Sequence, residues 1–181
     1  MPKEDYIPIL RSLLRQHGYD GATLSKISAA TGLGKASLYH HFPGGQDDMV
    51  TSILDYSDSW LQDNMIQLLT EEGSPEARPQ KMCDRINDLY DGGNQPCLLA
   101  IMQAGTGHNL FHDRVNAVLK AWIGAIAEGL VESGLDEALA LQRGQEAMIS
   151  IQGALMVSQS LDDTSVFLRT VEQLPQRLLR V

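Results

Sequence analysis

A group of side chains with chemistry suited to nucleic acid falls close to the N-terminus. Four of them share the outward face of a helix predicted over residues 35–41: Lys35, Ser37, Tyr39 and His40. Lysine and imidazole can meet phosphate oxygens, a serine hydroxyl can meet phosphate or a base edge, and tyrosine offers a flat apolar ring with a hydroxyl at its tip. The spacing therefore predicts a surface that fits a DNA groove.

Two short amphipathic helices joined by a glycine turn must hold this surface. Leu24, Ile27 and Ala30 recur at helical spacing, and Thr23 stands before them as a predicted N-cap. Gly32 can take a positive φ without steric cost, which ends the first helix and lets the second leave at a steep angle. The segment is therefore expected to form a helix-turn-helix.

The same segment resembles the N-terminal signature of the TetR family of transcriptional regulators. The matching residues are Thr23, Leu24, Ile27, Thr31, Gly32, Leu33, Ala36, Leu38, Tyr39, His41 and Phe42. The loop Pro43-Gly44-Gly45 is one residue longer than in most members and is similar to the LmrA/YxaF-like branch, whose members respond to small hydrophobic compounds. The resemblance implies an N-terminal DNA-binding domain followed by an all-helical ligand-binding and dimerisation domain.

Three positions depart from the family pattern. Ser28 stands where alanine is usual, and Gly34 stands where a serine or threonine normally caps the recognition helix. Gln46 stands where the family usually has a phosphate-contacting lysine, so that contact is left open. The residues predicted to contact DNA are Thr23, Lys26, Lys35, Ala36, Ser37, Tyr39 and His40.

Composition and charge fit a cytoplasmic DNA-binding protein. Of the 181 residues, 43% are hydrophobic and 20% are charged. No apolar run approaches the roughly 20 residues of a membrane span, and the N-terminus has no stretch typical of a signal peptide. Residues 1–45 carry a formal charge of +2 and the remainder −11, against −9 for the whole chain. A mildly basic end can therefore face DNA while the acidic body stays away from the phosphates.

The periodicity of apolar residues is helical along the whole chain, which predicts an all-α fold. A first helix is expected before the motif, ending at Gly18, and the last helix should be kinked or ended by Pro175. Ser74-Pro75-Glu76 is predicted to start a helix. The remaining helices are expected at about 46–72, 110–133 and 136–160. This organisation predicts a DNA-binding domain over residues 1–45 and a ligand-binding and dimerisation domain over residues 46–181.

Aromatic and methionine side chains of the body admit two interpretations. Core packing explains any single one of them, whereas the whole set is typical of a lined cavity between helices. No strong positive charge accompanies them, so a small hydrophobic or cationic effector is expected. The predicted ligand-binding residues are Tyr56, Trp60, Met82, Tyr90, Met102, Phe111, Trp122 and Met148.

The helix predicted over residues 136–160 has apolar residues on two faces, which indicates two packing partners. One partner is the core of the chain, and the other is expected to be a second copy in a four-helix interface with the terminal helix. The predicted dimer-interface residues are Ala147, Gly153, Ala154, Val157, Leu161, Phe167, Val171 and Leu174.

His108 and His112 lie four residues apart, a spacing that would put two imidazoles on one helix face as metal ligands. The pair follows a break at Gly107 and lacks a definite third ligand, so neither a metal site nor a cofactor is predicted. Cys83 and Cys97 are expected to be reduced core thiols. G-x-S-x-G, H-E-x-x-H and Walker motifs are absent from the sequence, and no catalytic residue is predicted.

We interpret the chain as a ligand-responsive transcriptional regulator of the repressor type. It is expected to bind a near-palindromic double-stranded operator as a homodimer and to release it when the effector enters the body. One alternative is a helical protein-interaction module with a degenerate DNA-binding head, motivated by Gln46 and the modest basic charge. A small metal-dependent enzyme built on His108 and His112 ranks last.

Overall fold

The computed structural model describes residues 2–70, 74 and 77–180. Every regular element among these residues is helical and none is a strand, so the prediction of an all-α fold is confirmed. The chain forms two compact units: Met1–Ser59 with Leu98–Val115, called here the head unit, and Trp60–Cys97 with Asn116–Val181, called the body unit. The boundary predicted after residue 45, between a DNA-binding domain and a ligand-binding and dimerisation domain, stays a prediction.

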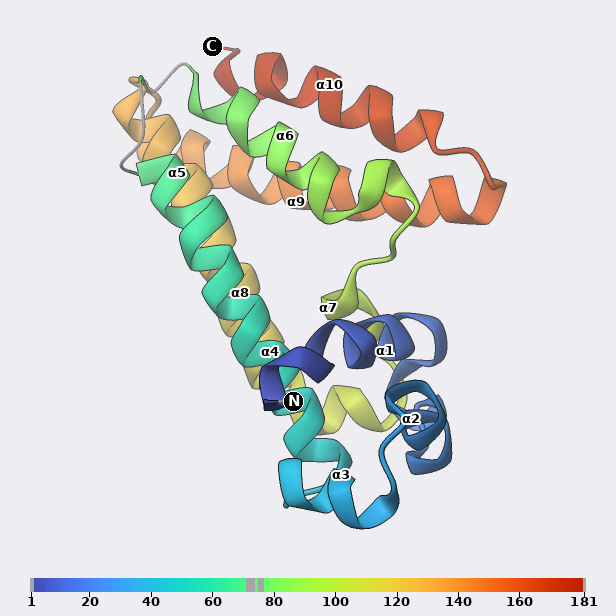
Figure 1. The fold of residues 1–181 in the computed structure, drawn as a ribbon. Helices are drawn as coiled ribbons and strands as arrows, with labels where there is room; N and C mark the ends of the chain where they lie inside the picture. The colour runs from blue at the N-terminus through green and yellow to red at the C-terminus, as the bar shows by residue number, and fades with distance from the viewer. Residues whose placement is uncertain (1, 71–73, 75–76, 181) are drawn as a thin grey trace. The chain divides into compact units, whose positions relative to one another are not determined.

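The head unit is built mainly from short helices (Figure 1), and it encloses a small apolar core. Its elements are η1 (Lys3–Tyr6), α1 (Ile7–Gly21), α2 (Leu24–Thr31), α3 (Lys35–His41), most of α4 (Gln46–Leu61), α7 (Leu98–Ile101) and the start of α8 (Gly105–Glu132). Ile27, Leu38 and Phe42 are all buried in this core. They are apolar positions at helical spacing, so burying them leaves the polar faces of α2 and α3 outside.

The body unit contains the long helices of the chain. Its elements are the end of α4, the π-helical segment η2 (Gln62–Ile66), α5 (Gln67–Thr70), α6 (Arg78–Leu89), η3 (Asp91–Gly93), the larger part of α8, α9 (Glu137–Leu161) and α10 (Ser165–Leu179). Helix α10 packs against both α9 and α6, as Figure 1 shows. Cys83 and Cys97 are free and buried in this unit, and burial raises the pKa of the Cys83 thiol to about 12.

Several predicted helix limits differ from the observed ones. Helix α1 continues to Gly21, with a kink at Gly18, and α8 begins at Gly105 rather than near residue 110. Helix α10 runs through Pro175, whose ring is buried, so packing compensates for the missing backbone donor. The start predicted at Ser74-Pro75-Glu76 includes residues outside the described ones, and α6 has Ala77 as its N-cap.

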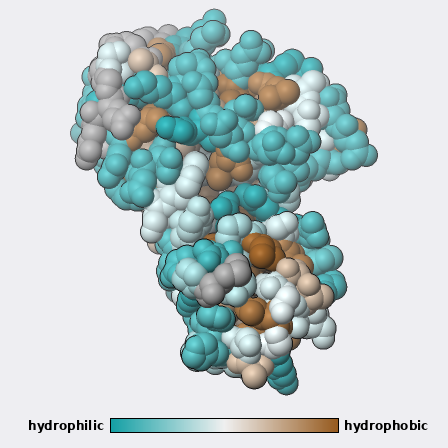
Figure 2. All heavy atoms as spheres, viewed as in Figure 1, coloured by the Kyte–Doolittle hydropathy of each residue, from teal (hydrophilic) through white to brown (hydrophobic). Residues whose placement is uncertain are grey.

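The outer surface is mostly hydrophilic on the face drawn in Figure 2, with smaller apolar patches between the polar side chains. Among the residues that the structure describes, none of the helices combines the length and the apolar character that a bilayer span requires.

Candidate nucleic-acid interface

The structure exposes one face of the short helix α3. Leu38 is buried, whereas the five residues that the sequence assigned to DNA contact on this helix are all exposed: Lys35, Ala36, Ser37, Tyr39 and His40. The other two assigned residues, Thr23 and Lys26, are exposed at the start of α2. All seven therefore lie at the surface of the helix-turn-helix, while their contact with DNA stays a prediction.

The turn between α2 and α3 is held by side-chain hydroxyls as well as by backbone. Gly32 has φ +71° and donates its N–H to the Ser28 carbonyl at 2.9 Å. The Thr31 hydroxyl donates to the Ile27 carbonyl at 2.7 Å and accepts from the Leu33 N–H at 3.3 Å. The Ser28 hydroxyl donates to the Leu33 carbonyl at 2.6 Å. The serine that replaces the usual alanine therefore ties α2 to the turn.

The helix starts agree with the predicted caps. Thr23 is the N-cap of α2, and its hydroxyl accepts a hydrogen bond from the Lys26 N–H at 3.5 Å. Gly34 is the N-cap of α3 and has no side chain to accept from the first turn. Helix α3 therefore begins at an exposed glycine without the side-chain cap that a serine or threonine would supply.

The longer loop after α3 supports the tyrosine of the recognition surface. Gly45 is buried with φ +67°, and its N–H donates to the Phe42 carbonyl at 2.8 Å. A Cβ atom added at Gly45 would lie 3.5 Å from Cε1 of the Tyr39 ring. The ring therefore rests on the glycine, which leaves the outer part of Tyr39 exposed in a defined orientation.

Gln46 has a partner within the head unit. Its side-chain Nε2 donates to the backbone carbonyl of Tyr19 in α1. Asp48, on the same turn of α4, accepts from Lys3 Nζ at 3.2 Å and from the Gly44 N–H at 3.4 Å. The side chain that replaces the usual lysine therefore fastens α4 to α1.

The lysines on helices α2 and α3 are not paired with acidic side chains in the described part of the chain. Lys3 is paired with Asp48, but Lys26 and Lys35 form no ion pair within the described residues. Two exposed, unneutralised cations on adjoining helices suit the oxygen atoms of a phosphate backbone.

An exposed helix on a helix-turn-helix is the arrangement of a DNA-binding transcriptional regulator, and comparison with known proteins gives the family. The model for bacterial regulatory proteins of the tetR family matches residues 10–52. The model for the C-terminal domain of LmrA/YxaF-like transcriptional regulators matches residues 80–173, which is more than half of the chain. The chain belongs to the TetR family of transcriptional regulators, as the sequence signature predicted.

Two regulators from Bacillus subtilis are similar over nearly their whole length. The uncharacterized HTH-type transcriptional regulator YxaF is 24% identical over 177 residues, covering 96% of this chain and 93% of that protein. The HTH-type transcriptional regulator LmrA is 20% identical over 182 residues, covering 98% and 97%.

Solved structures share the fold at low identity. A TetR transcriptional regulator from Legionella pneumophila has a TM-score of 0.85 at 18% identity, covering 97% of this chain and 96% of that one. A TetR-family regulator from Agrobacterium tumefaciens has a TM-score of 0.81 at 17% identity, with the same coverage of both chains.

The residues predicted to bind an effector are divided between the two units. Tyr56, Met102 and Phe111 belong to the head unit, and the body unit holds Trp60, Met82, Tyr90, Trp122 and Met148. Six of the eight are buried, whereas Tyr56 is exposed and Trp60 is half-buried. Their role in ligand binding stays a prediction.

Some of these side chains have partners in the core. Phe111 lies edge-on to Tyr19, with ring centres 5.7 Å apart, and Tyr90 lies edge-on to Phe167 at 6.0 Å. Trp122 differs from them, because its indole Nε1–H is buried without a hydrogen-bond partner. Most buried donors in proteins are paired, so the unpaired indole N–H of Trp122 is an exception.

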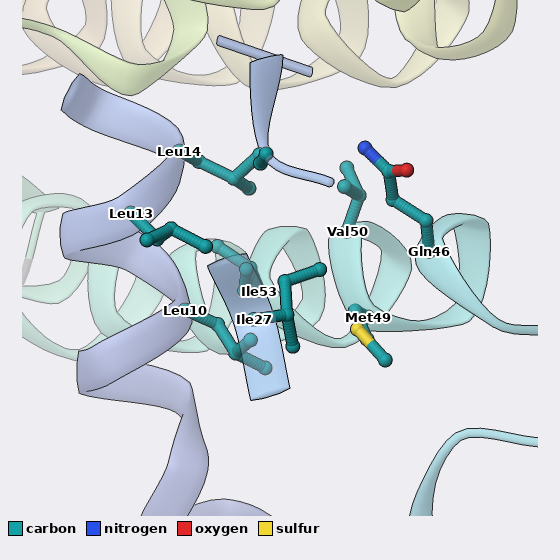
Figure 3. A pocket seen from close by; sticks show the side chains of 9 residues that line it. Leu10, Leu13, Leu14, Ile27, Gln46, Met49, Val50 and Ile53 are labelled. Carbon is teal, nitrogen blue, oxygen red and sulfur yellow. The ribbon is translucent and has the colours of Figure 1, made fainter. Parts of the chain in front are cut away.

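The small hollow drawn in Figure 3 lies in the core of the head unit and is lined by Leu10, Leu13, Leu14, Ala22, Ile27, Gln46, Met49, Val50 and Ile53. Its volume is about 10 Å³, close to the space that one water molecule requires. A hollow of the same size lies in the body unit beside Met82 and Ile126. Neither can hold a drug-sized effector, so both are packing gaps.

The predicted dimer-interface residues separate into two groups. Five of them are buried within the body unit itself: Ala147, Ala154, Phe167, Val171 and Leu174. Gly153, Val157 and Leu161 are exposed, and so are Ile149 and Met156 on the same helix. The first five residues therefore pack within the body unit, and Gly153, Val157 and Leu161 lie on the exposed side of α9. The role of these residues in dimerisation stays a prediction.

Sequence reasoning missed the residues that fasten α1 to its neighbours. The Tyr19 hydroxyl donates to the Asp47 carboxylate, and burial together with this hydrogen bond raises the pKa of Tyr19 to about 12. The Asp20 carboxylate accepts from the Thr106 N–H at 3.0 Å, and the hydrogen bonds from Thr106 lower its pKa. These contacts join segments far apart in the sequence, so no local pattern signals them.

The start of α8 is also joined to α4 by ion pairs. The Arg114 guanidinium contacts the carboxylate of Asp55 at 2.8 Å and that of Asp58 at 2.6 Å. The first three turns of α8 are thus part of the head unit by packing, hydrogen bonds and charge.

Proposed function

We propose that the protein is a repressor that binds a near-palindromic operator as a homodimer and releases it when a small hydrophobic or cationic molecule binds. The observation that carries the proposal is the exposed face of α3, with Lys35, Ser37, Tyr39 and His40, which follows a turn held by side-chain hydrogen bonds. An exposed helix of this kind can enter a major groove.

The dimer is supported by the exposed apolar side of α9. Ile149, Met156 and Leu161 are 71%, 65% and 63% exposed, and they recur at helical spacing with Gly153 and Val157 between them. An apolar stripe of this length is unfavourable in water and fits a second copy related by a two-fold axis. Two copies would present two recognition helices to half-sites about 34–36 Å apart.

Effector response is supported by the unpaired donor of Trp122 and by the path of the chain. Helix α4 begins in the head unit at Gln46 and ends in the body unit at Leu61. A ligand that binds one arrangement of the body better than another would shift α4 and with it the separation of the recognition helices. The expected site of action is the bacterial cytoplasm, where operator DNA lies.

Binding of DNA from beside the coding region, measured by fluorescence anisotropy at about 50 and 200 mM salt, tests the proposal. We expect saturable binding that competitor DNA of unrelated sequence does not abolish. A hydrophobic effector should quench tryptophan fluorescence and lower DNA affinity over one concentration range.

Two observations favour the alternative, a helical interaction module with a degenerate head. Gln46 is engaged with the Tyr19 carbonyl, and residues 1–45 carry only +2. Absence of DNA binding at the lower salt concentration, by a folded dimer, would establish this alternative instead.

A further inference from the structure

His108 and His112 form a pair of exposed imidazoles on the first turns of α8. The helix begins at Gly105, so both residues lie in regular helix, four residues apart on one face. Their ring centres are 4.9 Å apart, with 53° between the ring planes. The break at Gly107 that the sequence suggested does not occur, because this residue lies inside α8.

The separation of the rings matches that of two imidazoles bound to one metal ion. Metal–nitrogen bonds are about 2.1 Å long, and the nitrogen–metal–nitrogen angle lies between its square-planar and tetrahedral values. The ring centres of two imidazoles bound to one ion are then about 5 Å apart. The observed separation of the rings is therefore compatible with chelation of one ion. Two histidines at i and i+4 on a helix are also a spacing that zinc sites use.

Gln103 is a hydrogen-bond partner of His108. Nδ1 of His108 lies 2.9 Å from Oε1 of Gln103. In the tautomer in which Nδ1 donates to this amide oxygen, the lone pair of Nε2 is left for an ion. A ligand histidine whose second nitrogen donates to a carbonyl or carboxylate is the usual outer arrangement of metal sites.

We propose that His108 and His112 bind one divalent transition-metal ion through their Nε2 atoms. Imidazole ligands favour Zn²⁺, Ni²⁺ and Cu²⁺ over Mg²⁺ and Ca²⁺. In the described part of the chain no group of three or more His, Cys, Asp or Glu side chains has metal-binding geometry. Water therefore completes the coordination, and the site is exposed and exchangeable.

The position of the pair gives the ion a consequence for the head unit. Thr106, two residues before His108, donates its N–H to Asp20 of α1, and Phe111, next to His112, packs on Tyr19. An ion that bridges two successive turns stabilises the helical state of the segment that carries these contacts.

Isothermal titration of the untagged full-length chain with Ni²⁺ or Zn²⁺ tests the site. We expect one ion per chain, no heat of binding with Mg²⁺, and a loss of affinity of at least tenfold in each of His108→Ala and His112→Ala. Gln103→Ala should weaken binding by about tenfold. His17→Ala, which removes an exposed histidine of α1, is the matched control and should bind like the parent.

Two further readouts separate the site from an effect on folding. Circular dichroism should be unchanged in both variants because the two side chains are exposed. The His108 and His112 ring resonances should be the ones perturbed by substoichiometric Cu²⁺ in NMR spectra. Equal affinity in the parent, His108→Ala and His112→Ala, or absence of a saturable site in the parent, overturns the proposal.

Discussion

The helix-turn-helix and the core of the body unit differ in how their polar side-chain atoms are paired. In the turn, the part-buried hydroxyls of Ser28 and Thr31 each donate to a backbone carbonyl within the same motif. In the body unit, the indole N–H of Trp122 is buried and has no hydrogen-bond partner. The hydroxyls of the turn are therefore satisfied within the chain, whereas this buried donor is not.

This contrast fits the two tasks proposed for the protein, which are DNA recognition and response to an effector. A surface that reads DNA gains affinity when its geometry is fixed before binding, because less conformational freedom is lost on association. A regulatory core must have two arrangements close in free energy, and an unsatisfied polar group lowers the stability of one of them. Rigid recognition and responsive packing are therefore expected in different parts of one chain.

The largest effects are expected from glutamate substitutions in α9, and they should differ between its exposed side and its buried side. Met156→Glu places a charge on the exposed stripe and should give folded monomers, whereas Ala154→Glu buries an unpaired charge at a cost of about 3–5 kcal/mol and should unfold the protomer. Sedimentation velocity and circular dichroism distinguish these outcomes.

The control for this pair is Gln145→Glu, which adds the same charge at an exposed polar position of α9 and should leave a dimer. A parent protein that sediments as a monomer, or a Met156→Glu variant that remains dimeric, would place the interface elsewhere.

A smaller effect is expected where α9 meets α10. The buried Ser158 hydroxyl accepts from the Phe167 N–H at 2.9 Å. Ser158→Ala leaves that N–H buried without a partner and should lower the free energy of unfolding by about 1–3 kcal/mol. Urea denaturation measures the change. Ser160→Ala, at an exposed position two residues later, should change stability by less than about 0.5 kcal/mol.

A matched change in the turn should have a smaller cost. Ser28→Ala removes the hydrogen bond to the half-buried Leu33 carbonyl and should destabilise the protein by about 0.5–1.5 kcal/mol. Because alanine is usual at this position in the family, the variant should still fold. Ser25→Ala, on the exposed side of α2, serves as the control. Equal stability of the two variants would mean that the hydroxyl contributes nothing to the turn.

The smallest expected effect is spectroscopic. The pKa of Tyr19 is raised to about 12, so the neutral phenol is favoured in the folded state. This contribution to stability is fully present below pH 10 and is lost as the pH rises toward 12. Ultraviolet titration should show a late tyrosine ionisation step near pH 12 to which Tyr19 contributes. Tyr19→Phe should lower the amplitude of this step by one tyrosine, and Tyr56→Phe should leave it; an unchanged amplitude in Tyr19→Phe would contradict the assignment.

Local signals predicted the helix-turn-helix almost residue by residue. Thr23 caps α2, Gly32 ends it in the left-handed region, and α3 covers Lys35–His41. Each of these features depends on neighbours within a few residues, so the sequence alone contains the necessary information.

Long-range contacts explain where the sequence predictions were wrong. Helix α8 begins five residues early because Asp20 of α1 accepts from the Thr106 N–H at its start. Periodicity also could not show which of the two apolar faces of α9 packs within the body unit, because contact with α10 determines which face is covered. Helical periodicity also could not show whether Trp122 packs in the core or contacts a ligand, because both roles require the same spacing of apolar residues along the helix.

The salt dependence of DNA binding tests most directly whether α3 is the helix that reads DNA. Lys35→Ala should weaken binding and reduce the slope of log affinity against log salt by about one unit. Lys120→Ala, which removes an exposed lysine of the body unit, should bind with the affinity and slope of the parent. If Lys35→Ala binds DNA with the parent's affinity and salt slope, α3 does not face the DNA and the central claim is wrong.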